Sequence, residues 1–240
     1  MFTKIEQPEL LRKIVGQIKR NISAGRLTKG DKLPSERQMA EMFGLSRATV
    51  REAIKALDML GLVECSHGSG NYISSNLSNS LTEPLSIMFM LEGGNIDQTH
   101  ELRRAIEFAA AGAAARHIKP DSLKRLSSLC SRIENGPDEN EKAKYDLQFH
   151  YEIAAASQNP LLVTLLNAAE TLISEHIQDA RASILRIRGN ETIINRQHRE
   201  LLDALGRGDA EAAERTALAH MELIHKNILR KGKEDVPIEE

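Results

Sequence analysis

The segment LPSERQMAEMFGLSRATVREAIKALDMLGLVECSHGSGNYI, residues 33–73, decides the fold of the N-terminal part of the chain. Ser35 with Gln38 is the capping-box pattern that begins a helix, and Gly44 tolerates the left-handed conformation that ends one. The apolar side of this first helix consists of Met39, Ala40, Met42 and Phe43. After Ser46, a second cap, apolar residues recur at helical spacing at Val50, Ala53, Ile54, Leu57 and Leu60. Two short helices joined by a glycine-containing turn predict a helix-turn-helix unit.

The polar side of the second helix carries Arg47, Thr49 and Arg51 in its first turns. Recognition helices contact DNA bases with their N-terminal residues. Arg suits guanine or phosphate, and Thr suits phosphate or the thymine methyl group. The alternative is a helix-turn-helix that packs only against protein, and the cationic residues on the open face disfavour it. The segment therefore predicts DNA binding.

A small β-hairpin is expected directly after these helices. Leu62 to Cys65 reads as a strand, His67 to Gly70 as a turn, and Asn71 to Ile73 as the returning strand. Glycines in such a turn let the backbone approach a DNA groove closely. The expected unit is a winged helix-turn-helix.

The motifs LPSER, GLSRATVREAIKALDMLGLVE and HGSGNYI resemble the winged-helix domain of the GntR family of bacterial transcription regulators. The resemblance covers about the first third of the chain. It implies, together with the capping position, a DNA-contact set of Arg37, Ser46, Arg47, Thr49, Arg51, His67 and Gly68. In this implied set, His67 and Gly68 enter the minor groove from the wing. Ala48 occupies a position that varies among relatives, so the operator sequence does not follow from the resemblance.

Composition and charge distribution favour a mostly helical protein with two domains. Aromatic residues make up 3% of the chain, and Trp is absent from the sequence. Residues 1–76 carry 12 basic and eight acidic side chains, whereas the whole chain has a net charge of −2. A basic head on an acidic body suits a protein that binds nucleic acid with one end.

The sequence also predicts a cytoplasmic location. The N-terminus lacks the apolar stretch of a signal peptide, and no apolar run has the length that a bilayer requires. Cys65 and Cys130 have no spacing typical of metal or redox sites, which fits a reduced compartment.

The predicted domain boundaries follow the changes in pattern. Residues 1–75 form the DNA-binding domain, which includes an amphipathic helix from Pro8 to Ala24. Residues 76–81, which overlap the polar stretch SSNLSNS at 74–80, form a linker. Residues 82–230 form an antiparallel α-helical bundle, and residues 231–240 a disordered charged tail. Six or so helices with short connections are expected in the bundle, among them one that begins at Pro120 and a long one from Leu161 to about Arg188. The helix from Asp97 to His117 is expected to face inward with Leu102, Ile106, Ala109, Ala110 and Ala113.

Four residues of the predicted bundle form a pattern that suits a metal ion. Asp146 and His150 are four residues apart, which places both side chains on one helical face. His198 and His220 lie among apolar residues on the last two predicted helices, which should be antiparallel neighbours. Three imidazoles and a carboxylate suit Zn²⁺, with Ni²⁺, Co²⁺ or Mn²⁺ as alternatives. Ordinary hydrogen-bonded core histidines, or an acid–His pair on a helix surface, are the other interpretation.

The sequence DLQFH at 146–150, followed by Asn159-Pro160, His198 and His220, is similar to the effector domain of the FadR subgroup of GntR regulators. That all-helical (FCD) domain binds a metal through one Asp and three His in many members. The members that bind fatty acyl-CoA lack these residues, so the resemblance argues against such a ligand. It further implies that Arg103, in ELRRAIEFAAAGAAA, holds the carboxylate of an effector; a structural pair with Glu107 is the alternative. His100, His117, His176 and His225 are predicted to be ordinary surface or bordering residues.

Together these features predict a DNA-binding transcription regulator, a homodimeric repressor on a pseudo-palindromic operator, controlled by a small carboxylate bound with a metal. A DNA binder with a purely structural metal is the main alternative. A metal-dependent hydrolase is a further one, but no base or nucleophile motif accompanies the four candidate ligands.

Overall fold

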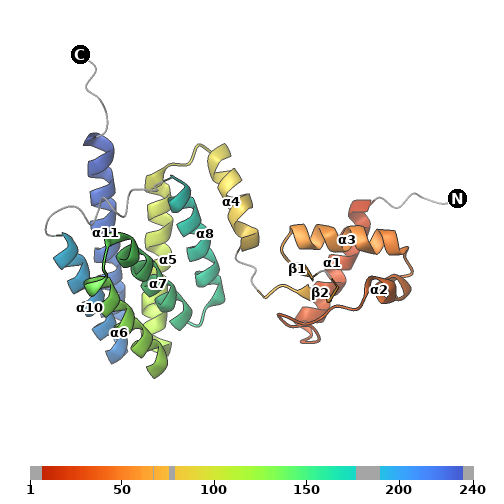
Figure 1. Cartoon of the computed structure of the whole chain (residues 1–240), viewed down its shortest axis with the longest axis horizontal. Helices are drawn as coiled ribbons and strands as arrows, with labels where there is room; N and C mark the ends of the chain where they lie inside the picture. The colour runs from red at the N-terminus through yellow and green to blue at the C-terminus, as the bar shows by residue number, and fades with distance from the viewer. Residues whose placement is uncertain (1–6, 67, 76–78, 177–189, 235–240) are drawn as a thin grey trace, which may run out of the picture. The chain divides into compact units, whose positions relative to one another are not determined.

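The computed structural model describes residues 7–66, 68–75, 79–176 and 190–234, and this part contains ten helices and one two-stranded sheet (Figure 1). The chain divides into two compact units, Met1–Pro84 and Leu85–Glu240. This confirms the predicted class, a mainly α protein with an N-terminal winged helix-turn-helix and a C-terminal helical bundle.

The first unit contains helices α1 (Gln7–Ser23), α2 (Glu36–Phe43) and α3 (Arg47–Met59). The predicted capping box is present: the Gln38 backbone N–H donates to Ser35 Oγ at 3.3 Å, and the Ser35 N–H donates to Gln38 Oε1 at 2.9 Å. Gly44 ends α2 with φ of 66°, the left-handed conformation that its position requires. These local signals explain why both helix boundaries were predictable.

Strands β1 (Val63–Ser66) and β2 (Gly70–Ile73) form the wing. They pair antiparallel, with Val63 opposite Ile73 and Ser66 opposite Gly70. Gly68 and Gly70 have φ of 80° and 116°, which a residue with a Cβ rarely adopts. The hairpin tip is therefore built on glycine. His67 lies outside the described residues.

One apolar core holds the three helices and the wing together. Its buried residues come from all of these elements and from the segment before α2: Ile14, Leu33, Met39, Ala40, Val50, Ala53, Ile54, Leu57, Val63 and Ile73. Two residues of the predicted apolar faces lie outside it, because Met42 is 70% exposed and Leu60 is 53% exposed. Leu60 is the C-cap of α3, beyond its last regular turn, and α2 is short enough to bury only a narrow stripe.

Helix α4 (Asn79–Leu91) begins within the stretch predicted as the linker. Residues 79–81 are helical, whereas residues 76–78 lie outside the described part of the chain. The polar first turn of α4 has no apolar periodicity, so the sequence alone did not distinguish it from a linker. At the other end, the last helix continues to Glu234, four residues into the predicted tail, and residues 235–240 lie outside the described part.

The second unit is a bundle of α5 (Ile96–His117), α6 (Pro120–Asn135), α7 (Glu139–Ala156), α8 (Pro160–His176), α10 (Asn190–Arg207) and α11 (Ala210–Glu234). Helix α5 is at its centre and contacts α7, α8, α10 and α11 (Figure 1). The predicted helix from 161 to 188 is described only as far as His176. Helices α10 and α11 are joined by a turn at Gly208, where φ is 67°.

Small residues on α5 let its neighbours approach closely. Ala110, Ala111, Ala114 and Ala115 are all buried in the bundle core. The first half of the same helix differs from the prediction, because Leu102 is 43% exposed and Ala109 is also exposed. Polar residues, including Arg103 and Glu107, take the inward positions there. The apolar pattern was therefore wrong at Leu102 and Ala109, whereas Ile106 is buried as predicted.

No described helix has both the length and the apolar character that a membrane crossing would need.

Candidate metal centre and nucleic-acid interface

A concave surface of about 890 Å³ on the winged-helix unit brings together side chains from α2, α3 and the wing. Arg37, Arg47, Arg51 and Gly68, from the predicted DNA-contact set, line it together with Lys32. Its position next to the N-terminus of α3 is where a recognition helix presents base-reading side chains. Four of the seven predicted residues thus share one cationic surface.

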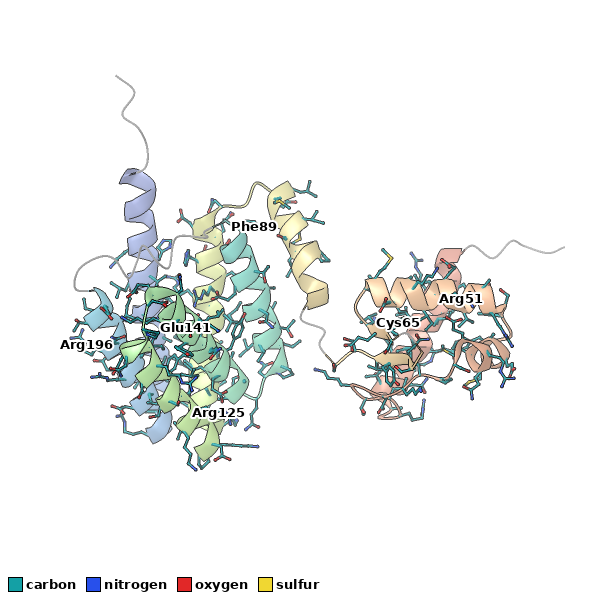
Figure 2. All side chains as sticks on the ribbon, in the orientation of Figure 1. Arg51, Cys65, Phe89, Arg125, Glu141 and Arg196 are labelled. Atoms are coloured by element: carbon teal, nitrogen blue, oxygen red, sulfur yellow. The ribbon has the colours of Figure 1, made fainter. Side chains whose placement is uncertain are left out.

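The three arginines of this surface differ in their local contacts. Arg51 Nε lies 3.0 Å from Glu36 Oε2, and Arg37 Nη1 lies 4.0 Å from Glu41 Oε1. Arg47 is exposed and makes no ion pair with another described residue. It is therefore the arginine whose donors are available to a phosphate or base without breaking an intramolecular pair. Figure 2 labels Arg51 on α3.

Ser46 and Thr49 contact each other at the start of α3. Ser46 Oγ accepts from the Thr49 backbone N–H at 3.1 Å and lies 2.7 Å from Thr49 Oγ1. Both residues shape the N-terminus of the helix, and neither is among the residues that line the concave surface.

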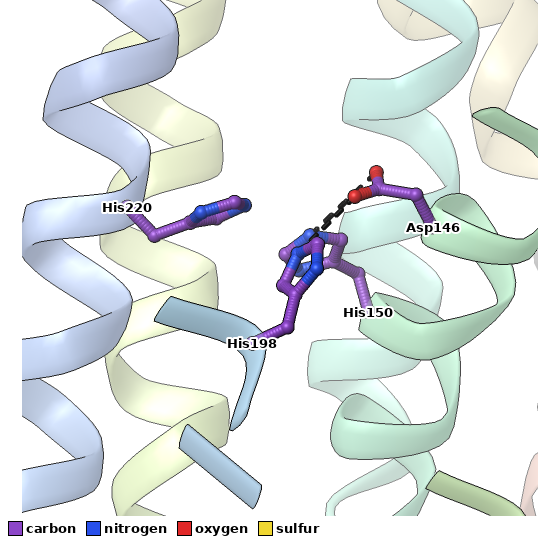
Figure 3. Close-up of side chains that lie close together, drawn as sticks. All are labelled: Asp146, His150, His198 and His220. Carbon is purple, nitrogen blue, oxygen red and sulfur yellow. Dashed lines mark ion pairs between the residues drawn. The ribbon is translucent and has the colours of Figure 1, made fainter. Parts of the chain in front are cut away.

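The structure brings the four predicted metal ligands together in the bundle. Helix α7 supplies Asp146 and His150, α10 supplies His198, and α11 supplies His220 (Figure 3). We call this set the His₃Asp cluster. One candidate donor atom from each residue lies within 4.8 Å of the other three, and all four residues are buried.

Asp146 faces two imidazoles of the His₃Asp cluster, as the dashed lines in Figure 3 mark. Its Oδ1 lies 3.2 Å from His198 Nε2, and its Oδ2 lies 3.9 Å from His150 Nε2. The His220 ring approaches from α11, with its centroid 4.7 Å from that of His198 and 5.2 Å from that of His150. The three imidazoles and the carboxylate therefore face one another in a single cluster.

Two polar side chains support the outer ring nitrogens of this cluster. His150 Nδ1 contacts Glu107 Oε2, and His220 Nδ1 lies 3.1 Å from Gln197 Oε1. Acceptors on Nδ1 fix the tautomer that leaves Nε2 free to bind a metal. Sequence reasoning did not identify these supports: Glu107 was noted only as a partner of Arg103, and Gln197 gave no signal of its own.

The donor set fits a divalent metal ion. His150 Nε2 and His220 Nε2 are buried and have no hydrogen-bond partner among the described residues. Leaving such atoms unpaired costs free energy, which a bound cation would remove. Burial, together with the neighbouring His198 and His150, holds the pKa of His220 well below its ordinary value. The ring is thus kept in the neutral form that a metal needs.

Arg103 lies at the centre of a buried charge network. Its Nε lies 2.6 Å from Glu107 Oε1 and 2.9 Å from Glu170 Oε1, so the structural pair with Glu107 is present. Its Nη2 is buried and has no partner among the described residues. Burial acts to raise the pKa of Glu107, but His150 and Arg103 together lower it below its ordinary value. The network links Arg103 through Glu107 to His150.

Two histidines predicted to be ordinary come together elsewhere in the bundle. The rings of His100, on α5, and His225, on α11, have centroids 5.6 Å apart. His100 is 5% exposed, so its prediction as a surface or bordering residue was wrong. The two residues are 125 positions apart in the chain, and only the packing of α5 against α11 reveals the pair.

A winged helix-turn-helix unit followed by a helical bundle is the architecture of a DNA-binding transcription regulator. The comparisons with known families agree. The profile described as "Bacterial regulatory proteins, gntR family" matches residues 10–73, and that described as "FCD domain" matches residues 98–223, more than half of the chain. The chain belongs to the GntR family and carries an FCD domain.

Known relatives support this assignment. The Bacillus subtilis HTH-type transcriptional regulator LutR is 34% identical over 206 residues, 83% of this chain and 92% of that protein. The putative L-lactate dehydrogenase operon regulatory protein of Escherichia coli is 26% identical, covering 90% of this chain and 85% of that protein. The structure of Streptococcus agalactiae GntR aligns with a TM-score of 0.65 and 25% identity, over 90% of this chain and 99% of that one. The chain is a DNA-binding transcription regulator and not an enzyme.

Proposed function

We propose that this regulator is a homodimeric repressor whose operator affinity is controlled by a small carboxylate bound with a divalent metal ion in the FCD domain. The observation that carries the proposal is the His₃Asp cluster, whose donor atoms converge, while Glu107 contacts Nδ1 of His150 and Gln197 contacts Nδ1 of His220. A cluster built in this way suits ligand binding better than core packing, because buried polar atoms are left without protein partners.

Asp146, His150, His198 and His220 would hold the metal, and Zn²⁺ suits a set of three imidazoles and one carboxylate. When bound, the metal supplies a Lewis-acidic centre for oxygen atoms of the effector. The chain's own residues orient these ligands: Glu107 holds His150 from α5, and Gln197 holds His220 from α10. Helices α5, α7, α10 and α11 therefore all respond to the occupancy of one site.

Arg103 is the proposed contact for the carboxylate of the effector. Its guanidinium is buried, and Glu107 and Glu170 hold Nε while Nη2 keeps an unused donor. A small acid with a hydroxyl or keto oxygen next to its carboxylate suits a site that combines Arg with a metal. The relative described as an operon regulator for L-lactate dehydrogenase makes L-lactate the first acid to test.

Operator binding is assigned to the concave cationic surface of the winged-helix unit, with Arg37, Arg47 and Arg51 as its main contacts. Ser46 and Thr49 would serve from the N-terminus of α3, and His67 and Gly68 from the wing. A homodimer presents two such surfaces, and its two-fold symmetry suits a pseudo-palindromic operator.

The test is thermal unfolding of the full chain against L-lactate, glycolate, pyruvate and citrate, each with Zn²⁺ or with EDTA. A ligand that binds only the native protein raises the unfolding midpoint by mass action. We expect one class of acid to raise the midpoint with Zn²⁺ and to have no effect with EDTA. An acid effect that persists in EDTA would contradict the role of the metal.

The second candidate is a purely structural metal without an effector. The near-complete burial of the cluster favours it, because His150, His198 and His220 are each no more than 2% exposed. In that case EDTA lowers the midpoint of thermal unfolding, while every acid of the panel leaves it unchanged.

A further inference from the structure

A second pair of imidazoles lies where the start of α5 packs against the second half of α11. The ring centroids of His100 and His225 are 5.6 Å apart. In the His₃Asp cluster, ring centroids are separated by 4.7 Å for His198 and His220 and by 5.8 Å for His150 and His198. The pair therefore has a ring spacing within the range found among the candidate metal ligands of the His₃Asp cluster.

Both rings have a buried nitrogen without a protein partner. His100 Nε2 and His225 Nδ1 make no hydrogen bond to any described residue, as is also true of His150 Nε2 and His220 Nε2. Burial, and then the charges of Arg103 and His225, lower the pKa of His100 to about 4. The His100 imidazole is therefore neutral at neutral pH, with a lone pair available to a cation.

The two histidines line a pocket of about 400 Å³ whose other polar residues include three carboxylates. Asp97 and Glu101 lie on the same face of α5 as His100, and Glu222 lies on α11 near His225. Carboxylates and neutral imidazoles are the ligands that divalent zinc and related metals prefer. Arg104 and Lys226 also line the pocket, and their positive charges would weaken the binding of a cation.

We propose that this pocket is a second divalent-metal site, with His100 Nε2 and His225 Nδ1 as its two nitrogen ligands. A carboxylate of Asp97 or Glu222 supplies a third ligand by rotation of its side chain, and water completes the coordination. The site binds more weakly than the His₃Asp cluster, because it has fewer buried protein ligands and cations on its rim.

This second site has a consequence for the regulator. It cross-links α5 and α11. Helix α5 carries Glu107, which contacts His150, and α11 carries His220 of the His₃Asp cluster. Met221, adjacent to His220 in the chain, lines the pocket. A metal ion in the pocket therefore holds α5 and α11, which support the His₃Asp cluster, in a fixed position relative to each other. The regulator would then respond to the free metal concentration as well as to the effector.

The experiment compares zinc binding by tag-free, metal-stripped full-length proteins in equilibrium dialysis, with zinc measured by mass spectrometry. We expect wild type to bind a tight and a weak class of zinc, and His225→Asn and His100→Gln to lose the weak class. His117→Asn, at an exposed histidine of α5 outside the pocket, is the matched control and should keep both classes. Far-UV circular dichroism in EDTA establishes that each variant is folded.

Two further comparisons keep this inference separate from the proposed function. A His150→Asn/His198→Asn double variant should lose the tight class and retain the weak one. Asp97→Asn with Glu222→Gln, both exposed positions, should weaken the second class at least several-fold without disturbing the fold. If the His225→Asn and His100→Gln proteins bind as much zinc as wild type over the whole titration, the second site does not exist.

Discussion

At the scale of single residues, the most informative side chains are those that hold a ligand in place. Glu107 contacts His150 Nδ1 with one oxygen and lies 2.6 Å from Arg103 Nε with the other. One carboxylate thus orients a candidate metal ligand and anchors the candidate effector contact. Removal of the Glu107 carboxylate should therefore weaken both metal binding and effector binding, although Glu107 itself would contact neither the metal nor the DNA.

The variant Glu107→Gln tests this support. The amide keeps the shape of the side chain but loses the charge that favours the His150 N–H, so metal affinity should fall about 10- to 100-fold. Competition with a chromogenic chelator measures the change. Glu152→Gln, which alters a carboxylate of α7 paired with Arg125, is the control and should retain wild-type metal affinity. Equal affinities in Glu107→Gln and wild type would exclude the supporting role.

Arg47 carries the corresponding prediction for DNA. Arg47→Ala should weaken specific operator binding by about 1–3 kcal/mol, roughly 5- to 150-fold, if the side chain reads a guanine. If it holds a phosphate, the loss should be similar for all sequences, and the salt dependence should decrease. Arg26→Ala is the control, because Arg26 bonds to Asn21 and does not line the concave surface. Fluorescence anisotropy with labelled duplexes distinguishes these outcomes, and unchanged affinity would remove Arg47 from the interface.

At the scale of elements, the helices were predictable wherever a local signal marks their ends. The Ser35–Gln38 capping box, Gly44 and the Pro at position 120 mark boundaries that the structure reproduces. The inward face of α5 was harder, since polar residues occupy part of it. His100, Arg103 and Glu107 are buried next to other polar side chains. A search for apolar periodicity cannot predict the burial of polar residues.

The start of α5 offers a test at this scale. Asn95 caps the helix, with its Oδ1 accepting from the Gln98 N–H at 3.1 Å and Gln98 Oε1 accepting from the Asn95 N–H at 3.1 Å. Asn95→Ala should lower the free energy of unfolding by about 0.5–2 kcal/mol, because it leaves first-turn N–H groups unpaired. Chemical denaturation measures the change. Asn140→Ala, at an exposed position inside α7, should cost less, and equal losses would show that the cap is unimportant.

At the scale of the whole molecule, residues far apart in the chain meet only through packing. The His₃Asp cluster was predictable because its residues follow a family pattern, and helical spacing placed Asp146 and His150 on one face. The local sequence did not predict the contacts of Glu170 and Gln197 or the His100–His225 pair, because it does not specify which distant residue each one meets. The packing of α5 against α8 and α11, and of α10 against α11, supplies that information.

A pH dependence follows from the burial of His100. Its pKa is lowered to about 4 in the folded protein, below the ordinary value of 6.5 in the unfolded chain. Between these two pH values the unfolded state therefore binds more protons than the folded state. The contribution of neutral His100 to the free energy of unfolding is complete above pH 6.5 and is lost as the pH falls toward 4. His100 can change the free energy of unfolding by at most about 1.4 kcal/mol per pH unit.

Denaturation of metal-free protein in EDTA between pH 7 and pH 5 tests this dependence. The His100→Gln variant should lose less stability over this range than wild type, because it lacks the group that takes up the proton on unfolding. His117→Gln, at an exposed position of the same helix, is the control for the loss of a histidine. If the free energy of unfolding depends on pH in the same way in His100→Gln and in wild type, His100 is not buried in the neutral form.

The central claim is that metal and effector together control DNA binding. The most direct measurement is the operator affinity of the full-length protein, using a duplex selected from a random-sequence pool, with and without Zn²⁺ and L-lactate or the acid that stabilises the protein. The account predicts that metal and acid together change the affinity about 5- to 150-fold, and that EDTA abolishes the effect of the acid. An operator affinity that is the same under all of these conditions, although the acid binds, would contradict it.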